Sequence, residues 1–352
     1  MKLVFVHPPL DACPSGGNVF NRHVIDRAVE SGFPLETMAI SSDGAMPTFS
    51  RLPRDSIILW DSLLLESLSN CPLVQDGPIH GFLAHYVPFL NPLLDADRRK
   101  EEKDRFERAA ERVQFFIATG LSIQRLLERL YPGKPVFLCE PGVDAAFLAA
   151  RQASAEPTAG WTIQIATVAN LLPAKGLTEL LEILAKLQHY CWAWHLVGDD
   201  RTDPGYTERF RSRIAELGLQ TRITRHGVLD TPKLAQLLGA MDIFAFASRF
   251  EAYGMALAEA AAVGLPIVTT AVGEASRIVQ HGKTGFVAPI ADPDAFRDGL
   301  EQLLSDHELR RRCRSRLLLN TPRTWDAAFA DFGNAIRTVC ATAIELERSR
   351  SP

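Results

Sequence analysis

Short apolar runs alternate with longer amphipathic segments along almost the whole chain, and this alternation limits the folds open to it. The first run is Leu3–Val6, and the amphipathic segment Asn18–Glu30 follows it. Strands separated by helices predict βαβ units, in which parallel strands form a sheet covered by helices. Further strands are expected at Leu35–Ile40, Ile57–Trp60, Val113–Ala118 and Val136–Leu138, and an exposed charged helix at Asp95–Arg112.

The alternation restarts beyond Ala149–Gly160, a stretch that is poor in large apolar residues and typical of a linker. Because each half repeats the pattern, we predict an α/β protein of two doubly wound, Rossmann-like domains that face each other across a cleft. The elements expected in the second half are strands Trp161–Val168, Trp192–Val197, Ile223–His226, Ile243–Ala247 and Pro266–Thr269, and helices Leu177–His189, Tyr206–Leu217, Pro232–Ala240 and Gly254–Val263, with mainly helix after Asp294.

Bulk properties exclude several classes of protein. The net charge of −4 gives no electrostatic case for a nucleic-acid partner. Met1–His7 is too short for a signal peptide, and no run approaches the ~18 apolar residues of a membrane span. The six cysteines are scattered without a C-x-x-C pair, which fits a reducing compartment. We therefore expect a soluble cytoplasmic protein.

The basic run Arg310–Arg316 is the strongest local charge. We interpret it as a solvated helix end, and a patch for a membrane or an acidic partner is the alternative. Peripheral membrane contact is therefore not indicated.

The segment Ser248–Glu259 carries the clearest chemical signal. It follows an apolar strand and leads into an Ala-rich helix. Free N–H groups and the positive dipole end of a helix attract phosphate, and Gly254 lets the backbone approach closely. Glu251 and Glu259 can accept hydrogen bonds from hydroxyls, such as those of sugar and ribose. The pattern predicts a site for a phosphorylated, polyhydroxylated ligand.

From Trp161 to Phe296 the chain resembles the nucleotide-binding half of the GT-B glycosyltransferases of family 4, a retaining group. The matching motifs, in order, are Val168–Gly176, a turn with a phosphate-binding lysine; Leu196–Asp200, a Gly-Asp turn; His226-Gly227, which lines the nucleobase; the E-x7-E pair Glu251 and Glu259; and Gly285-Phe-Val beyond it.

The resemblance implies a role for each matching position. Glu251 would hold hydroxyls of the donor sugar, and Glu259 would hold the ribose. Lys175 would stabilise the leaving nucleoside diphosphate, which is usually the largest catalytic term. The implied catalytic residues are Glu251, Lys175 and His85, and the implied donor-binding residues are Gly16, Gly17, Asn170, His226, Gly227, Ala252, Tyr253, Gly254, Met255, Ala256 and Glu259.

Asn170 departs from the family pattern, which has an arginine five residues before the lysine. An amide cannot replace the bidentate phosphate contact of a guanidinium. Either Arg249 or Arg277 compensates, or phosphate binding is weaker.

The first half resembles the family's acceptor-binding domain less closely. Val6–Asn18 ends a strand in a Gly-Gly loop that looks like the family's glycine loop, near donor phosphates and acceptor; a plain turn is the alternative. It is not the G-x-G-x-x-G of a dinucleotide site, which argues against an NAD(P) enzyme. Asn18 is a candidate acceptor contact, and Asp61 either contacts the acceptor or caps a helix.

His80–Pro88 resembles the segment in which many members place a histidine beside the reacting sugar. We favour His85 over His80 because His85 directly follows the apolar run. It is a candidate for both catalysis and acceptor binding, and a structural histidine is the alternative.

The resemblance also implies the domain limits. Pro141–Asp144 resembles the turn before the interdomain crossing, and we interpret it as structural. The helix from Trp325 to about Leu346 resembles the segment that returns to the first domain; an ordinary terminal helix is the alternative. The expected domains are 1–148 for the acceptor, 149–324 for the nucleotide sugar and 325–352 for the returning helix.

The expected activity is that of a retaining hexosyltransferase with a nucleoside-diphosphate sugar as co-substrate, without metal or cofactor. UDP is the first expectation for the nucleotide and GDP the second. The acceptor is unidentified: glycan, lipid, protein and small molecule all remain open. The alternatives are a sugar-nucleotide epimerase or phosphorylase on the same scaffold, or a non-catalytic nucleotide-sugar-binding protein.

Overall fold

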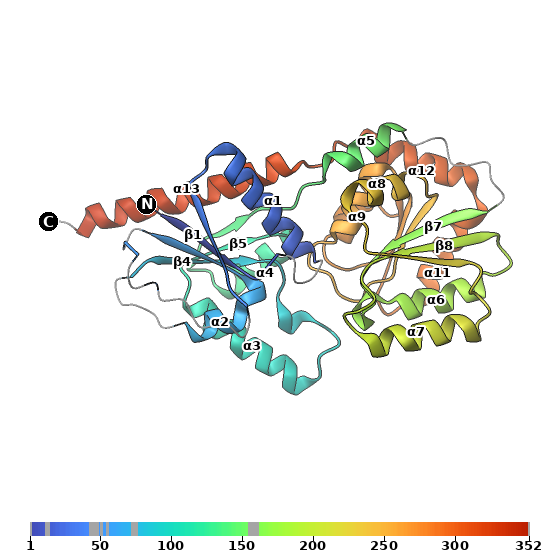
Figure 1. Cartoon of the computed structure of the whole chain (residues 1–352), viewed down its shortest axis with the longest axis horizontal. Coiled ribbons are helices and arrows are strands. Elements are labelled where there is room, and N and C mark those ends of the chain that lie inside the picture. Colours follow the sequence, from blue (N-terminus) through green and yellow to red (C-terminus); the bar gives the residue numbers. More distant parts are fainter. Residues whose placement is uncertain are drawn as a thin grey trace. The chain divides into compact units, whose positions relative to one another are not determined.

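The computed structural model of the chain divides into two compact units (Figure 1). Unit 1 comprises Met1–Gly142 with Trp325–Pro352, and unit 2 comprises Val143–Thr324. The structure describes residues 2–10, 15–41, 49, 52–53, 56–71, 77–153 and 162–350, with the backbone alone for 152–153 and 343–350. Residues 11–14 of the expected glycine loop and 154–160 of the expected linker lie outside this description.

Unit 1 contains a sheet of six parallel strands in the order β2-β1-β3-β4-β5-β6. Strand β4 was missed in the sequence because Gly81 and a histidine interrupt its apolar run. That glycine is required by packing, since a Cβ at its position would lie 2.1 Å from Cζ of Phe115. The strands are β1 (Leu3–His7), β2 (Leu35–Ala39), β3 (Ile57–Asp61), β4 (Ile79–Ala84), β5 (Phe115–Ala118) and β6 (Val136–Leu138).

The C-terminal helix α13 (Trp325–Arg350) packs on unit 1, beside α1 (Gly16–Ser31) (Figure 1). The ring of Trp325 stacks on His23 with centroids 4.1 Å apart. The predicted return of the C-terminal helix is therefore confirmed. The other helices of unit 1 are η1 (Ser62–Leu64), α2 (Leu65–Asn70), η2 (Pro88–Leu90), α3 (Ala96–Glu111) and α4 (Leu121–Leu130).

Unit 2 contains a second sheet of six parallel strands, in the order β12-β11-β10-β7-β8-β9. The strands are β7 (Ile163–Val168), β8 (Trp192–Val197), β9 (Ile223–Gly227), β10 (Ile243–Phe246), β11 (Ile267–Thr270) and β12 (Gly285–Ala288). The two sheets confirm the predicted α/β class with two doubly wound, Rossmann-like sheets.

Helices cover both faces of the second sheet (Figure 1), as parallel strands require. One face carries α6 (Leu177–Lys186), α7 (Pro204–Glu216) and α11 (Pro293–Ser305), and the other carries α5 (Ala145–Ala153), α8 (Thr231–Gly239) and α9 (Met255–Val263). The remaining elements are η3 (Pro173–Lys175), α10 (Ala275–Ile278) and α12 (His307–Leu319).

Helix α5 belongs to unit 2, so the division of the chain falls after Gly142, ahead of this helix. Asp144 begins the helix by accepting a hydrogen bond from the N–H of Ala146 at 2.8 Å. The helix then packs on α8 and α9. It occupies the first residues of the segment expected to be a linker.

The interpretation of Arg310–Arg316 as a solvated helix end was wrong for two of its residues. Arg310 and Arg314 are only 4% and 8% exposed, whereas Arg311, Arg312 and Arg316 are exposed. Nη1 of Arg310 donates to the carbonyl of Leu303 at 2.5 Å. Their i, i+4 spacing places both side chains on the buried face of α12.

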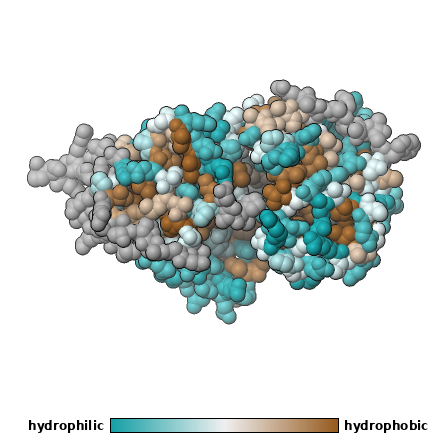
Figure 2. Space-filling view, viewed as in Figure 1, coloured by the Kyte–Doolittle hydropathy of each residue, from teal (hydrophilic) through white to brown (hydrophobic). Residues whose placement is uncertain are grey.

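Figure 2 shows hydrophobic residues in separate patches among hydrophilic ones. Large exposed hydrophobic side chains such as Val29 and Leu319 occur. Within the part of the chain that the structure describes, no helix is both long and apolar enough to cross a bilayer.

Candidate functional site

The second sheet reverses its strand order between β7 and β10. Strand β7 comes first in the chain, β8 follows on one side of it, and β10 lies on the other. Connections that leave neighbouring strands in opposite directions open a crevice at the carboxyl edge of a parallel sheet, where ligands bind. Lys175 follows β7 and Glu251 follows β10, so both lie at this switch point.

Lys175 and Glu251 form an ion pair. Nζ of Lys175 lies 2.5 Å from Oε1 of Glu251, and the two side chains are 24% and 15% exposed. Oγ of Ser248 lies 3.2 Å from the same carboxylate oxygen and 3.2 Å from the carbonyl oxygen of Ala174, so its single proton can go to either acceptor. The charges therefore meet where a ligand from solvent can reach them. Sequence reasoning missed Ser248, whose signal is its place as the first polar residue after β10.

A close backbone approach brings the two loops together. Gly176 has φ +63°, and a Cβ there would lie 1.9 Å from the carbonyl oxygen of Ala247. The N–H of Arg249 donates to the carbonyl of Ala174 at 2.8 Å. Only glycine fits at position 176, because any other residue would have to adopt the strained φ and its Cβ would clash with the carbonyl of Ala247.

Helix α9 begins at the same crevice. Its N-cap is Gly254, with φ +98° and no side-chain hydrogen bond to the helix. The N–H groups of Met255 and Ala256 belong to the first turn, where no intrahelical acceptor exists. A backbone hydrogen bond supports the loop before this helix: the N–H of Glu274 donates to the carbonyl of Tyr253 at 3.1 Å. Gly273 also approaches closely, because a Cβ there would lie 2.9 Å from the carbonyl oxygen of Ala252.

Glu259 on α9 has a pKa well above the ordinary value of a carboxyl. Burial, with the negative charge of Asp144 as a second cause, raises the pKa of Glu259 from an ordinary 4.5 to about 8. The carboxyl is only partly exposed, so its charged form is poorly solvated. Asp144 was interpreted as structural, and it does cap α5, but its charge also reaches Glu259. A carboxyl whose pKa is shifted this far by burial and a neighbouring charge is a candidate for ligand binding.

We expect Glu259→Gln to be more thermostable than the wild type at pH 8. Because the folded pKa is raised, the folded state binds the proton more tightly than the unfolded state between pH 4.5 and 8. Wild-type stability is therefore lost as pH rises through that window, and glutamine removes the loss. Calorimetric melting should show a gap that grows from pH 5 to pH 8, with about 3 °C for each ~1 kcal/mol.

Glu208→Gln is the matched control, because Glu208 lies on α7 with its side chain 73% exposed. Its melting temperature should follow the wild type at every pH. A Glu259→Gln gap that is constant with pH would contradict the raised pKa.

Asn170 takes part in the structure of the turn. Its Oδ1 accepts a hydrogen bond from the N–H of Asp199 at 2.9 Å. The N–H of Leu171 donates in turn to the carbonyl of Asp199 at 2.8 Å. The amide thus links the loop after β7 to the loop after β8.

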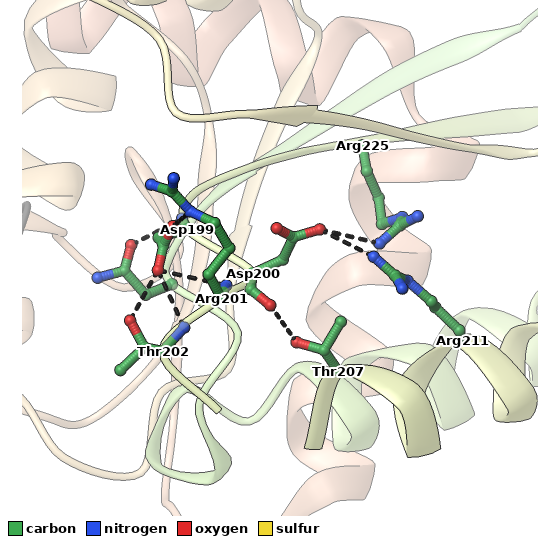
Figure 3. Close-up of polar contacts among 8 residues, drawn as sticks. Asp199, Asp200, Arg201, Thr202, Thr207, Arg211 and Arg225 are labelled. Carbon is green, nitrogen blue, oxygen red and sulfur yellow. Dashed lines mark hydrogen bonds and ion pairs between the residues drawn. The ribbon is translucent and has the colours of Figure 1, made fainter. Parts of the chain in front are cut away.

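The Gly-Asp turn after β8 directs its two carboxylates to different partners (Figure 3). Asp199 accepts from Nε of Arg201 at 2.8 Å and from Oγ1 of Thr202 at 2.7 Å, and these hydrogen bonds lower its pKa. Asp200 pairs with Arg211 at 3.2 Å and with Arg225 at 3.3 Å. Both carboxylates hold the turn in shape.

His226 lies near the end of β9, an edge strand. Its Nε2 is 3.0 Å from Nδ1 of His195, whose Nε2 is 2.8 Å from Oε1 of Gln164. Burial and the neighbouring His226 lower the pKa of His195. The contacts of His226, His195 and Gln164 therefore run across the neighbouring strands β9, β8 and β7. Gly227, which follows His226, has φ +67°.

The two arginines considered as substitutes for the missing cation differ in their partners. Nη1 of Arg277 lies 3.0 Å from Oε2 of Glu274, which is 3% exposed. Nη1 of Arg249 lies 3.4 Å from Oε1 of Glu179, and both of these side chains are over 40% exposed. The Arg249 contact is the longer and more solvated of the two, and hence the easier for an anion to replace.

Unit 1 has its own switch point, between β1 and β3. Helix α1 follows β1 and starts at Gly16, which is exposed, and Gly17. Asp61 ends β3, and His85 directly follows β4. A Cβ at Gly17 would lie 3.1 Å from Cδ2 of His85, so the structure brings the glycine loop against the histidine.

Asp61 and His85 belong to a buried polar cluster. Nε2 of His85 lies 2.9 Å from Oδ1 of Asn21 and 3.4 Å from Oδ2 of Asp61, and Nδ2 of Asn21 donates to the same Asp61 oxygen. Asp61 also accepts from the N–H of Leu63 at 2.6 Å, so it caps η1. Asn21 was missed; its signal is a polar residue at the spacing of the buried face of α1, with Asn18, Val24 and Ala28.

His80 has a structural environment. It is 6% exposed, Nδ1 accepts from Nε1 of Trp60 at 3.0 Å, and burial lowers its pKa to about 4. His80 is therefore part of the core of unit 1, and the role of His85 stays a prediction. Asn18 is also buried, and its N–H donates to Oγ of Ser15 at 3.2 Å.

Among the described side chains, no group of three or more histidines, cysteines, aspartates and glutamates could hold a metal ion.

Comparison with known families identifies most of unit 2. Residues 151–317 match the family model described as glycosyl transferases group 1. A curated relative is the D-inositol 3-phosphate glycosyltransferase of Jonesia denitrificans, 29% identical over 221 residues. The alignment covers 58% of this chain and 52% of that protein, so the chain spans about half the length of that relative.

Solved structures match over nearly the whole chain. Sucrose-phosphate synthase from Thermosynechococcus elongatus has a TM-score of 0.76 at 17% identity, covering 97% of this chain and 100% of that one. HepE of Anabaena, solved in complex with UDP and glucose, has a TM-score of 0.71 at 16% identity, covering 96% and 99%. At these identities the likeness establishes the fold, which is GT-B.

Proposed function

We propose that this chain, whose residues 151–317 match the family model described as glycosyl transferases group 1, transfers a hexose-type sugar from a nucleoside diphosphate to a hydroxyl-bearing acceptor with retention of configuration. One observation carries the proposal: the ion pair of Lys175 and Glu251 lies at the switch point of the second sheet. A cation for phosphate and a carboxylate for hydroxyls thus lie side by side within reach of solvent.

The donor would lie along the carboxyl edge of unit 2. Lys175 would leave Glu251 and pair with the diphosphate, while the carboxylate turns to the hydroxyls of the sugar. The first-turn N–H groups at Met255 and Ala256 would bind phosphate oxygens at the positive end of α9. Glu259 would accept hydrogen bonds from the ribose.

The chemical step follows from these positions. The bond between the anomeric carbon and the diphosphate oxygen breaks, and negative charge develops on the leaving group beside Lys175. The acceptor hydroxyl attacks from the same face, and its proton passes to the departing phosphate oxygen. The nucleobase would lie toward His226 and Gly227, and His85 would contact a substrate hydroxyl.

We propose UDP as the nucleotide. HepE, which shares the fold, was solved in complex with UDP and glucose, and this supports UDP-glucose as the first donor to test.

Calorimetric titration with UDP, GDP, ADP and dTDP in EDTA tests the proposal. We expect one nucleotide, UDP first, to bind at least tenfold more tightly than the others, with the same affinity when Mg²⁺ replaces EDTA. Metal independence is expected because Lys175 and the helix N-terminus supply the positive charge. Millimolar or weaker binding of all four would contradict the proposal and favour a non-catalytic protein.

Glu259→Gln separates ribose recognition from phosphate binding. At pH 9, above the raised pKa of Glu259, the wild type should prefer UDP over 2′-deoxyUDP by about 1.5–3 kcal/mol, the range for a hydrogen bond to a charged group. The variant should lose most of that preference. Glu208→Gln is again the control, and an unchanged preference in Glu259→Gln would move the ribose contact elsewhere.

A further inference from the structure

Three polar side chains are buried together in unit 1, from three separate elements. Asn21 comes from α1, Asp61 ends β3 and His85 follows β4; they are 0%, 0% and 8% exposed. Buried polar groups must satisfy one another. The direction of each hydrogen bond in the cluster can therefore be worked out from Asp61.

The carboxylate of Asp61 only accepts hydrogen bonds. Its Oδ2 receives Nδ2 of Asn21, so the amide nitrogen faces the aspartate. The amide oxygen then faces His85, at 2.9 Å from Nε2. A carbonyl oxygen cannot donate, and hence the imidazole proton lies on Nε2.

The ring of His85 is also fixed in place. Its backbone N–H donates to Oγ of Ser62 at 3.0 Å, and Phe20 packs against the ring edge-on with centroids 5.3 Å apart. The close approach of Gly17 limits the ring from another side. Turning the ring over would break the bond to Asn21.

We propose that Asn21 is a positioning residue that holds the proton of His85 on Nε2, so that Nδ1 keeps its lone pair and accepts a hydrogen bond from a substrate hydroxyl. No hydrogen bond to Nδ1 of His85 comes from a described residue. The carboxylate of Asp61 orients the amide, and the amide orients the imidazole. The inference rests on the proposed function only through the substrate contact of His85.

Nitrogen-15 NMR of the histidine-labelled full chain tests the inference without a substrate. His85→Gln assigns the signals of His85. At pH 8 the wild type should show a protonated-type nitrogen at Nε2 and an unprotonated-type nitrogen at Nδ1, as one form. In Asp61→Leu the amide of Asn21 loses the group that fixes its direction, and in the double variant Asn21→Leu/Asp61→Leu neither acceptor near Nε2 of His85 remains. Both variants should show a second population of His85 with the proton on Nδ1.

His80 supplies the fold control within the same spectra. Its Nδ1 accepts from Trp60, so it is the Nε2–H form too, and it does not contact Asn21. Its signals should stay unchanged in both variants. A proton on Nδ1 of wild-type His85 would overturn the inference, and so would a single Nε2–H form in the folded double variant Asn21→Leu/Asp61→Leu.

A failure of the proposed function can be distinguished from a failure of this inference. Absence of nucleotide binding would overturn that function, while the tautomer of His85 in the free protein would still decide the role of Asn21.

Discussion

Replacing Lys175 by alanine is expected to lower the turnover of UDP-glucose by about 100-fold to 1000-fold. The ammonium lies at the switch point, 2.5 Å from Glu251, where the diphosphate of a donor would develop charge. Binding of UDP should weaken as well, because the same cation contacts the phosphates before and after the bond breaks. Release of UDP into water gives a readout that needs no acceptor.

Lys186→Ala is the matched control, because Lys186 is an exposed lysine at the other end of α6. It removes the same charge from the helix that follows Lys175, and its turnover should match the wild type. Equal losses in both variants would assign the effect to net charge and contradict a specific role. Arg249→Ala in the same assay tests whether that guanidinium replaces the arginine missing at Asn170.

Glu251→Gln is expected to separate nucleotide binding from turnover. The carboxylate neutralises Lys175 in the free protein, so its removal frees the ammonium and removes a repulsion toward the diphosphate. UDP should bind about fivefold more tightly, the equivalent of ~1 kcal/mol for a partly exposed ion pair. Turnover of UDP-glucose should still fall by about 100-fold, because the sugar loses its charged hydrogen-bond acceptor.

The opposite directions distinguish this carboxylate from a structural one. If Glu251 only supported the loop, its substitution would disorder the loop and would weaken both UDP binding and turnover. Glu208→Gln, at an exposed position of α7, should change neither quantity. Weaker UDP binding in Glu251→Gln would therefore contradict the assignment of the ion pair as a switch between free and bound states.

Local patterns were enough to predict the architecture. Apolar runs of strand length between amphipathic segments predicted both parallel sheets, and the E-x7-E segment predicted the strand, loop and helix that carry Glu251. Gly81 hid β4, because a glycine inside a strand looks like a break until Phe115 is seen to fill its place. The buried Arg310 and Arg314 were missed for a similar reason, since a basic run does not reveal which face of its helix is covered.

The sequence by itself determined the fold class and the match of residues 151–317 to the group 1 glycosyl transferases, and it predicts the donor-site segments, because all of these depend on spacing along the chain. Only the tertiary structure decided which side chains meet: Lys175 with Glu251, Asp144 with Glu259, and Asn21 between Asp61 and His85. Each of these sets joins residues from separate elements at one sheet edge or between packed helices. Their charge states depend on burial and on neighbours brought together by folding, which no local pattern encodes.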